Sequence, residues 1–309
     1  MGEGSSLWDN NWDKHSVEEA LKSNCTLRVI SLLRKYFLKG RRILEGGCGL
    51  GQYVVYFKNS VYHIFGLYFS KKGLKKVSSF MNDLPLITGD VGLLPVKDNS
   101  FSAYYSGGVV EHFESGPEEA IKEAHRVLDK KDGLLLISVP YVNLLRKFKV
   151  FFMILKTLRG FKKPEVNKNI SYEDFESGLI LVDGHKKTKS PFRDKEFMQY
   201  SYGKKEFSDI LKKCGFKVIC CEGYSLEWGL MDLKWFRELI NKKKVSSGSD
   251  KSCAENIDRK GMLNKLRDVV NVFYKFVFLE YPTNNYLFKM LRAICRPIFA
   301  NMILFVCKA

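Results

Sequence analysis

The sequence predicts an α/β protein with a doubly wound, mostly parallel sheet, an antiparallel last strand and helical insertions. Continuous apolar runs rich in β-forming residues, typical of strands buried on both faces, alternate with segments whose apolar residues recur at helical spacing. A glycine-rich turn follows the first of these runs. Alternating strands and helices form parallel sheets with right-handed crossovers, and ligands bind such sheets at the carboxyl ends of the strands.

The first predicted strand leads into a turn with glycine at alternate positions. Residues 41–51 read RRILEGGCGLG, so Glu45 ends the strand before Gly47, Gly49 and Gly51. Glycines leave bare backbone for a ligand, and the next helix, predicted over 51–59, offers unpaired N–H groups at its start. Glu45 adds a fixed anion, which suits an amine or a hydroxyl pair. The turn lacks the lysine of a phosphate loop and the G-x-G-x-x-G spacing of a dinucleotide site.

The next elements follow from apolar spacing and from capping residues. Residues 61–69 form a continuous apolar run, which predicts a buried strand. A helix is predicted over 70–81, with Ser70 as its N-cap and an apolar face of Leu74, Val77 and Phe80. A second helix begins after Pro117, and its apolar face consists of Ala120, Ile121, Ala124, Val127 and Leu128. Residues 134–139 predict another buried strand.

Four segments, in order along the chain, resemble the class I S-adenosylmethionine-dependent methyltransferases, in particular those of type 11. Residues 43–51 reproduce the first motif of that family, a hydrophobic strand followed by an acid and x-G-x-G-x-G. Residues 86–101, LITGDVGLLPVKDNSF, are similar to the stretch in which a Gly-Asp pair meets the adenine. Residues 108–113 match the loop after the fourth strand, and residues 123–139 resemble the next helix and strand. The resemblance implies a Rossmann-like fold, S-adenosylmethionine as cofactor and methyl transfer as the activity.

The resemblance also implies which residues contact the cofactor. Glu45 would help to hold its methionine part, and the same ligand would face the backbone of the turn at Gly47, Cys48, Gly49 and Gly51. Asp90 would accept a hydrogen bond from the adenine amino group, beside the N–H of Val91.

Two positions depart from the family pattern. The second strand normally ends in an acid that binds both ribose hydroxyls, whereas this chain has Tyr68 there. A phenol forms one such bond but does not accept two as an anion, so we expect a loss of ~1–3 kcal/mol of cofactor affinity. Ser102 replaces another acid at the start of the fourth strand. Both changes leave the pocket intact, with a weak or inactive enzyme as the alternative.

Glu111 and His112 follow the fourth strand and are expected to border the methyl acceptor. Methyl transfer from a sulfonium needs proximity and orientation, plus a base when the acceptor is a hydroxyl. His112 is the preferred base because the unperturbed pKa of histidine lies near neutrality, and the alternative is a histidine that only hydrogen-bonds to its loop. Gly108 stands where similar ubiquinone-biosynthesis O-methyltransferases have a further Glu, so no metal site is expected.

The matching segments span roughly a hundred residues, the core of the family needs about two-thirds of the chain, and we place the surplus in two insertions. We expect an N-terminal helical cap at 1–40, the cofactor-binding core at 41–140, a basic-apolar insertion at 141–200, a core helix and strand at 201–226, a second insertion at 227–298, and the final core strand at 299–309. Within these parts we expect a helix over 204–214, a strand over 215–224, an antiparallel partner strand over 300–308 and a polar loop over 242–260.

A net charge of +17 is the strongest compositional signal. Basic and apolar residues interleave over 143–168 and again over 269–299. These stretches are too charged to span a bilayer but suit helices that lie on an anionic membrane surface, the alternative being a lid with a basic rim. The eight cysteines lack metal-site spacing and no secretory segment is visible. We therefore expect reduced thiols and a cytoplasmic protein that is peripheral at the membrane.

The function that we expect is methyl transfer, by O-methylation, to a small molecule, a sugar or a lipid-linked saccharide. A nucleic-acid methyltransferase is one alternative, because the chain is basic. Enzymes that methylate amino groups of nucleic acids, however, carry Asn/Asp-Pro-Pro-Tyr/Phe after the fourth strand, where this chain has SGGV at residues 106–109. A non-catalytic, membrane-associated scaffold that keeps the fold is the other alternative.

Overall fold

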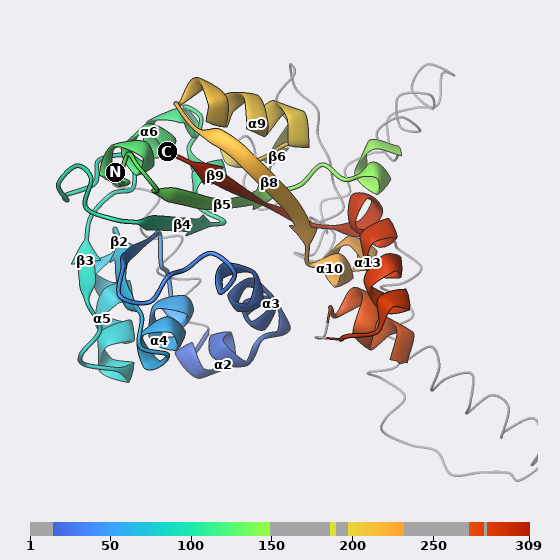
Figure 1. The fold of residues 1–309 in the computed structure, drawn as a ribbon, viewed down its shortest axis with the longest axis horizontal. Helices are drawn as coiled ribbons and strands as arrows, with labels where there is room; N and C mark the ends of the chain where they lie inside the picture. Colours follow the sequence, from blue (N-terminus) through green and yellow to red (C-terminus); the bar gives the residue numbers. More distant parts are fainter. Residues whose placement is uncertain (1–14, 149–185, 190–196, 232–271, 281–282) are drawn as a thin grey trace, which may run out of the picture.

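The computed structural model describes residues 15–148, 186–189, 197–231, 272–280 and 283–309. Its centre is a seven-stranded sheet with the order β3-β2-β1-β4-β5-β9-β8 (Figure 1). The strands are β1 Arg42–Gly46, β2 His63–Tyr68, β3 Leu86–Thr88, β4 Ala103–Gly107, β5 Leu134–Pro140, β8 Lys217–Tyr224 and β9 Met302–Lys308. Strands β1 to β5 pair in parallel, and β9 is antiparallel to both β5 and β8. The predicted fold class, with its antiparallel last strand, is confirmed.

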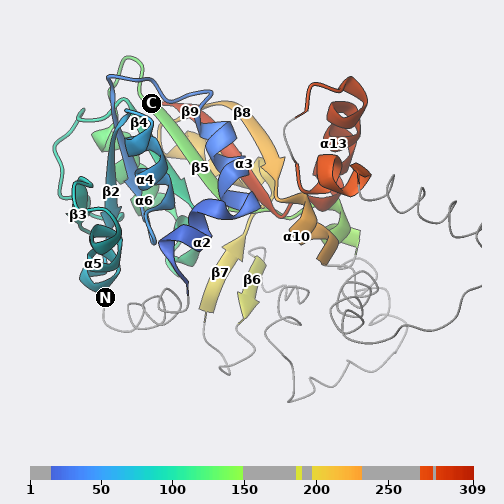
Figure 2. The ribbon, with the colours of Figure 1, turned by 90° about the horizontal axis from the view of Figure 1, so that it is seen from below.

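Helices cover both faces of this sheet (Figures 1 and 2). One face carries α2 Val17–Lys22, α3 Asn24–Leu33, α4 Gln52–Asn59 and α5 Lys71–Phe80, and the other carries α6 Glu118–Val127 and α9 Lys204–Lys213. Each face has its own apolar cluster, and neighbouring residues of β1 point into different ones: Ile43 into the first and Leu44 into the second. This alternation is the expected result of the two-residue period of a strand.

The predicted core elements are confirmed, with ends that move by a few residues. The Ser70 hydroxyl caps α5 by accepting the Gly73 N–H at 3.0 Å. The expectation for Phe80 is wrong, because this last residue of α5 is 40% exposed while Leu74 and Val77 are buried. Steps of three residues turn about 60° backwards around a helix, so the third member of an i, i+3, i+6 series leaves the buried face. Leu128 is buried, but it follows α6 as its C-cap.

A small hairpin within the first insertion was not predicted. β6 (Lys186–Lys189) pairs antiparallel with β7 (Phe197–Ser201), and Tyr202 then bridges Tyr141 just beyond β5. The sequence of β6, KKTK, lacks the apolar alternation that signals a half-buried strand. Most of the basic-apolar stretch 143–168, and all of the polar loop expected at 242–260, lie outside the described residues.

A third group of helices extends one end of the sheet. It consists of α10 (Leu226–Met231), the π-helical turn η2 (Tyr274–Phe278) and α13 (Tyr286–Phe299), and it stands apart from the two helical layers in both views (Figures 1 and 2). A small apolar cluster joins these elements to one another through Leu226, Leu230, Val277, Phe278 and Ala300. Within the described part of the chain, no helix has both the length and the apolar character needed to cross a membrane.

Candidate active site

The predicted site residues meet at the carboxyl edge of the parallel strands. The N–H groups of Gly47 and Cys48 both donate to the carbonyl of Leu67 near the end of β2, at 2.8 and 3.0 Å. The Gly89 N–H donates to the carbonyl of Tyr68, the last residue of β2, at 3.1 Å. The loops after β1, β2 and β3 are thus tied to one another at the edge where the strand order reverses between β1 and β4.

The turn after β1 can be built only with glycine at several positions. Gly47, Gly49 and Gly51 have φ values of +80°, +51° and +66°. A Cβ at Gly47 would lie 2.4 Å from Cγ2 of Val109, and one at Gly51 would lie 2.6 Å from Cγ1 of Val77. The turn therefore packs directly against the loop after β4 and against α5.

Glu45 and Gln52 carry buried oxygen atoms without a partner on either side of this turn. Glu45, in β1, is 3% exposed, and its Oε2 has no hydrogen-bond partner. Burial raises the pKa of Glu45 well above its ordinary range, against a hydrogen bond from the Val54 backbone. Oε1 of Gln52, the first residue of α4, is likewise buried and unpartnered. Two buried acceptors left unsatisfied are costly, and they fit a ligand that brings donors, such as an ammonium group.

Gln52 was missed by the sequence analysis. Its position directly after the third glycine, at the start of the helix that follows the turn, was the available signal.

Tyr68 and Asp90 stand at neighbouring strand ends. Tyr68 is buried, and its ring lies so close to α5 that a Cβ at Gly73 would be 2.8 Å from its Cε1. Asp90 follows β3, and its Oδ1 accepts the N–H of Gly92 at 2.8 Å. Val91, between them, is buried. At the position where the family pattern has an acid, the ring of Tyr68 packs in the core. The carboxylate of Asp90 is half-buried and lies in a tight turn.

Glu111 and His112 lie on the short 3₁₀ helix η1 (Val110–His112) after β4 but do not share an environment. Glu111 is 2% exposed, and its Oε2 has no hydrogen-bond partner. Burial raises the pKa of Glu111 to about 8, although backbone N–H groups in its own loop oppose the rise. His112 is half-buried. Successive residues of a 3₁₀ helix are rotated by about 120°, so the carboxyl and the imidazole diverge.

Three tyrosines missed by the sequence analysis lie near the loop after β4 or near the end of the neighbouring strand β5. Tyr202, which follows β7, is buried. Its phenol has a raised pKa, mainly because it is buried and to a smaller extent because of the Glu111 carboxylate. The hydroxyl of Tyr200, in β7, donates to the Glu114 carbonyl at 2.8 Å, which holds β7 against the loop after β4. Tyr224, on β8, donates to Oγ of Ser138 at 3.0 Å. No local signal marks these residues, because they reach the site only through the unpredicted hairpin and the far end of the sheet.

Comparisons with known proteins agree with this geometry. Residues 44–137 match the family described as a methyltransferase domain. No curated protein matches the chain significantly. Similar solved structures include a chain from the complex of the Haloferax volcanii Trm112 methyltransferase activator with a methyltransferase. That chain has a TM-score of 0.50 and 14% identity, over 98% of this chain and 95% of the other.

Two further solved structures have lower TM-scores. An S-adenosylmethionine-dependent methyltransferase from Archaeoglobus fulgidus has a TM-score of 0.46 and 14% identity, over 93% of this chain and 95% of the other. The [4+2]-cyclase SpnF has a TM-score of 0.47 and 13% identity, over 91% of this chain and 79% of the other. At these identities the likenesses concern the fold alone. The family match over residues 44–137, the glycine turn and the sheet order all agree with a methyltransferase domain in this part of the chain.

Proposed function

We propose that the protein methylates a hydroxyl oxygen of a small molecule, a sugar or a lipid-linked saccharide, with Glu111 as the general base. The observation that carries this proposal is the setting of Glu111. Its carboxyl group is buried, one of its oxygens has no partner, and its loop packs on the glycine turn through the contact between Val109 and Gly47. The unsatisfied oxygen is thus positioned to accept a proton next to the predicted cofactor site.

The cofactor residues follow from the unsatisfied acceptors and the bare turn. S-adenosylmethionine, when bound, supplies an electrophilic methyl group on a sulfonium. Glu45 and Gln52 would accept hydrogen bonds from its ammonium group, because both have a buried oxygen without a donor. A cation at Glu45 would also favour the ionised carboxylate and so offset part of its burial cost. Asp90 and the Val91 N–H would read the adenine edge, and Tyr68 would bind one ribose hydroxyl.

Glu111 suits a hydroxyl acceptor better than His112 does. A hydroxyl must lose its proton during methyl transfer, and a base with a pKa near the working pH transfers that proton most effectively. Burial brings the pKa of Glu111 to about 8, whereas an ordinary carboxylate is a much weaker base. Oε2 of Glu111 would take the proton from the acceptor oxygen. Tyr202, buried beside Glu111, would help to exclude water from this place.

A pH–rate profile with labelled S-adenosylmethionine tests this assignment. The acceptors would be phenols, free sugars and lipid-linked sugars, and the products would be examined for the methylated atom. We expect kcat/KM to rise with pH through about 8, because Glu111 must be deprotonated to act as a base. Glu111→Gln should lower kcat/KM by about 10²–10⁴-fold and remove this rise. Calorimetry should show that the variant still binds the cofactor.

His112→Gln separates the two candidate bases, since the proposal predicts that this variant keeps the rise of rate with pH. If the rate of His112→Gln no longer rose with pH while that of Glu111→Gln still did, His112 would be the general base. Methylation of nitrogen alone across all acceptors would overturn the O-methylation proposal.

A further inference from the structure

Helix α13 exposes a row of apolar residues, while its two arginines face the protein. Its two arginines, Arg292 and Arg296, point toward the protein, and Arg292 is buried. The apolar part of its exposed face consists of Tyr286, Leu287, Met290, Ala293, Ile294 and Pro297, with the exposed Lys289 beside it. At about 100° per residue, these six positions form one arc of roughly 120°. The most exposed of these side chains, Tyr286, is 79% exposed. A continuous apolar face on a surface helix marks a contact with something outside the described fold.

Buried polar contacts hold α13 in this orientation. Nη2 of Arg296 lies 2.6 Å from Oε1 of Glu222 on β8, and Nη2 of Arg28 on α3 reaches the same oxygen at 2.6 Å. Nη2 of Arg292 donates to the Phe276 carbonyl at 2.5 Å. Rolling the helix to bury its apolar face would break these contacts and leave guanidinium groups without partners. The outward apolar face is therefore a consequence of how α13 is anchored.

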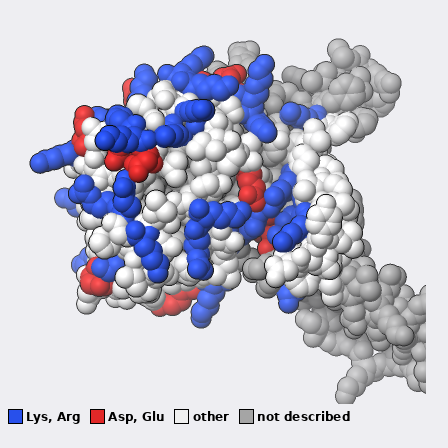
Figure 3. Space-filling view, viewed as in Figure 1, with Lys and Arg blue, Asp and Glu red and all other residues white. Residues whose placement is uncertain are grey.

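Among the described residues, the exposed charged groups of α13 and of the neighbouring η2 are positive. Within α13 there is no acidic residue, and Lys289 is its exposed charge. Lys275, on η2, is also exposed, while Glu280 at the end of that segment is buried against Arg28. Figure 3 shows a mostly white surface over α13 at the right of the view, and many Lys and Arg side chains over the rest of this face. An apolar face bordered by lysines, on a chain of net charge +17, is complementary to an anionic lipid surface.

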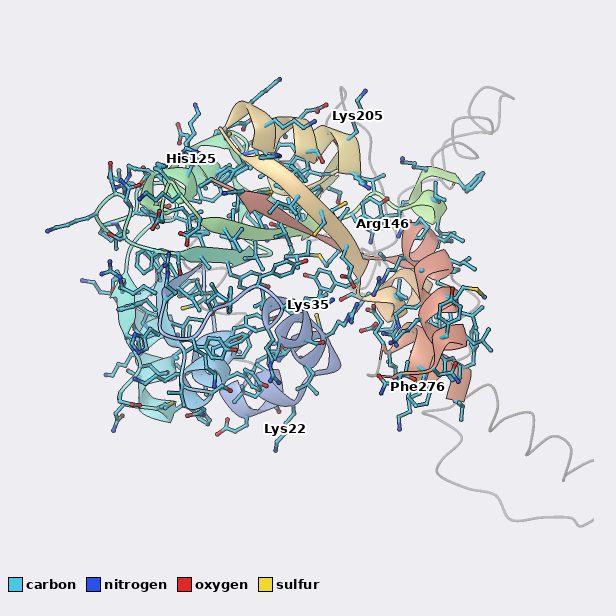
Figure 4. All side chains as sticks on the ribbon, in the orientation of Figure 1. Lys22, Lys35, His125, Arg146, Lys205 and Phe276 are labelled. Carbon is cyan, nitrogen blue, oxygen red and sulfur yellow. The ribbon has the colours of Figure 1, made fainter. Side chains whose placement is uncertain are left out.

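The same helix lies off the sheet edge that carries the candidate active site. After α13 the chain enters β9, whose first residue, Met302, pairs with Pro140 at the carboxyl end of β5. The Tyr141 N–H donates to the Asn301 carbonyl at 2.8 Å, and the Asn143 side chain donates to the Ala300 carbonyl at 3.0 Å. In Figure 4, Arg146 lies by one end of α13 and Phe276 lies toward the other end. Because β5 is parallel to β4, its carboxyl end shares the edge from which Glu111 follows.

We propose that the exposed face of α13 docks on an anionic lipid surface and holds the active-site edge next to it. Leu287, Met290 and Ile294 enter the boundary between headgroups and acyl chains, Tyr286 lies at the headgroup level, and the lysines contact anionic headgroups. Docking does not depend on catalysis. Docking would favour a lipid-linked acceptor over a freely soluble one, and this choice of acceptor rests on the proposed function.

Vesicle flotation with the full chain tests the proposal. The probes are vesicles of phosphatidylcholine alone and of phosphatidylcholine with phosphatidylglycerol in equal parts. We expect the wild type to float with the anionic vesicles at low salt, and added salt should weaken binding by screening the lysines. The double substitution Leu287→Asp/Ile294→Asp should lower binding at least tenfold. Both side chains are more than half exposed, so the variant should fold.

A matched control places two aspartates at exposed apolar residues elsewhere. Leu27 and Leu38 are 50% and 60% exposed and lie outside α13. Leu27→Asp/Leu38→Asp changes the net charge equally and should bind vesicles like the wild type. The proposal is overturned if the wild type stays unbound at low salt, or if both double variants bind equally. A dimer in sedimentation that Leu287→Asp/Ile294→Asp dissociates, without vesicle binding, would assign the face to a second copy. Cofactor binding, measured separately, should be the same in all variants.

Discussion

At the scale of single residues, both the backbone conformation and the packing around Gly47 require glycine. Its φ of +80° is in the left-handed region, and a Cβ would lie 2.4 Å from Val109. Gly40 has a similar φ of +76°, but a Cβ there would have nothing within 4 Å. Alanine substitutions at the two positions therefore allow a comparison: both would strain the backbone, but only the one at Gly47 would also clash with a neighbouring side chain.

Gly47→Ala should destabilise the protein more than Gly40→Ala and should abolish cofactor binding. Left-handed backbone costs an alanine about 1–2 kcal/mol, which both variants incur. The contact with Val109 adds to this cost only at position 47, because the new methyl group pushes the turn away from the loop after β4. Chemical denaturation would measure the free energy of unfolding, and calorimetry would measure the binding of S-adenosylmethionine.

Val109→Ala provides the internal control for that comparison, since it removes the two methyl groups nearest to the added Cβ. In the Val109→Ala background, Gly47→Ala should cost about as much as Gly40→Ala. Equal costs of Gly47→Ala and Gly40→Ala in the otherwise wild-type protein would contradict the packing argument.

Residues whose roles depend on their immediate neighbours in sequence could be predicted. Ser70 caps its helix as expected, and the glycine turn follows Glu45 as expected. The burial of Glu111 could not be predicted from its own segment, because η1 packs against β5 and against β7, which lies about ninety residues farther along the chain. The sequence therefore favoured His112 on the basis of ordinary pKa values, whereas the structure gives the near-neutral pKa to the carboxyl group.

At the scale of elements, one largely buried ion cluster connects four segments that are separate in sequence: α3, β8, the end of the η2 segment and α13. Arg28 on α3 contacts Glu222 on β8 at 2.6 Å and Glu280 after η2 at 3.2 Å. Burial raises the pKa of Glu280, and the guanidinium groups of Arg28 and Arg296 oppose that rise. Attraction thus offsets only part of the desolvation cost, so the cluster fixes the positions of α3, β8 and α13 more than it adds net stability.

Arg28→Met should destabilise the protein by about 3 kcal/mol, because it leaves the almost fully buried carboxylate of Glu280 with a more distant partner, Arg296 at 3.8 Å. Adding Glu280→Gln should restore part of the loss, since it removes the uncompensated charge. Denaturant unfolding of the two single variants and the double variant gives the coupling directly.

Arg41→Met is the matched control for the cluster. Arg41 pairs with Asp132 at 2.8 Å, but both side chains are about half exposed, so its loss should cost less than about 1 kcal/mol. Strictly additive effects of Arg28→Met and Glu280→Gln would show that the two side chains do not interact.

The elements of the parallel core could be predicted because each carries its own periodicity. The position of α13 could not, although the basic-apolar composition of residues 269–299 drew attention to that stretch. Composition alone suggests that the basic residues of such a helix face water. Here Arg296 points inward instead, because its partner Glu222 comes from a strand more than seventy residues earlier in the chain.

For the whole molecule, the carboxyl edge of the sheet combines three features: the glycine turn, the buried Glu111 and the outward apolar face of α13. The sequence predicts the first from its motif, and it predicts a cationic, membrane-facing protein from its charge. It does not predict that the proposed catalytic site and the proposed lipid-binding face lie toward one edge, which depends on the register of β5 with β9. Membrane binding by the basic-apolar stretch 143–168 stays a prediction, since most of that stretch lies outside the described residues.

Titration calorimetry of the full chain with S-adenosylmethionine tests the central claim most directly. Two buffers with different ionisation enthalpies, used between roughly pH 5.5 and 7, would report the protons released on binding. We expect saturable binding with a Kd in about the micromolar range. Protons should be released on binding because burial raises the pKa of Glu45 and the ligand's ammonium group favours its ionised form, so affinity should increase with pH over the range in which Glu45 titrates. Glu45→Gln should bind more weakly and release no proton. No saturable heat at millimolar S-adenosylmethionine or S-adenosylhomocysteine, or equal proton release by Glu45→Gln, would contradict the account.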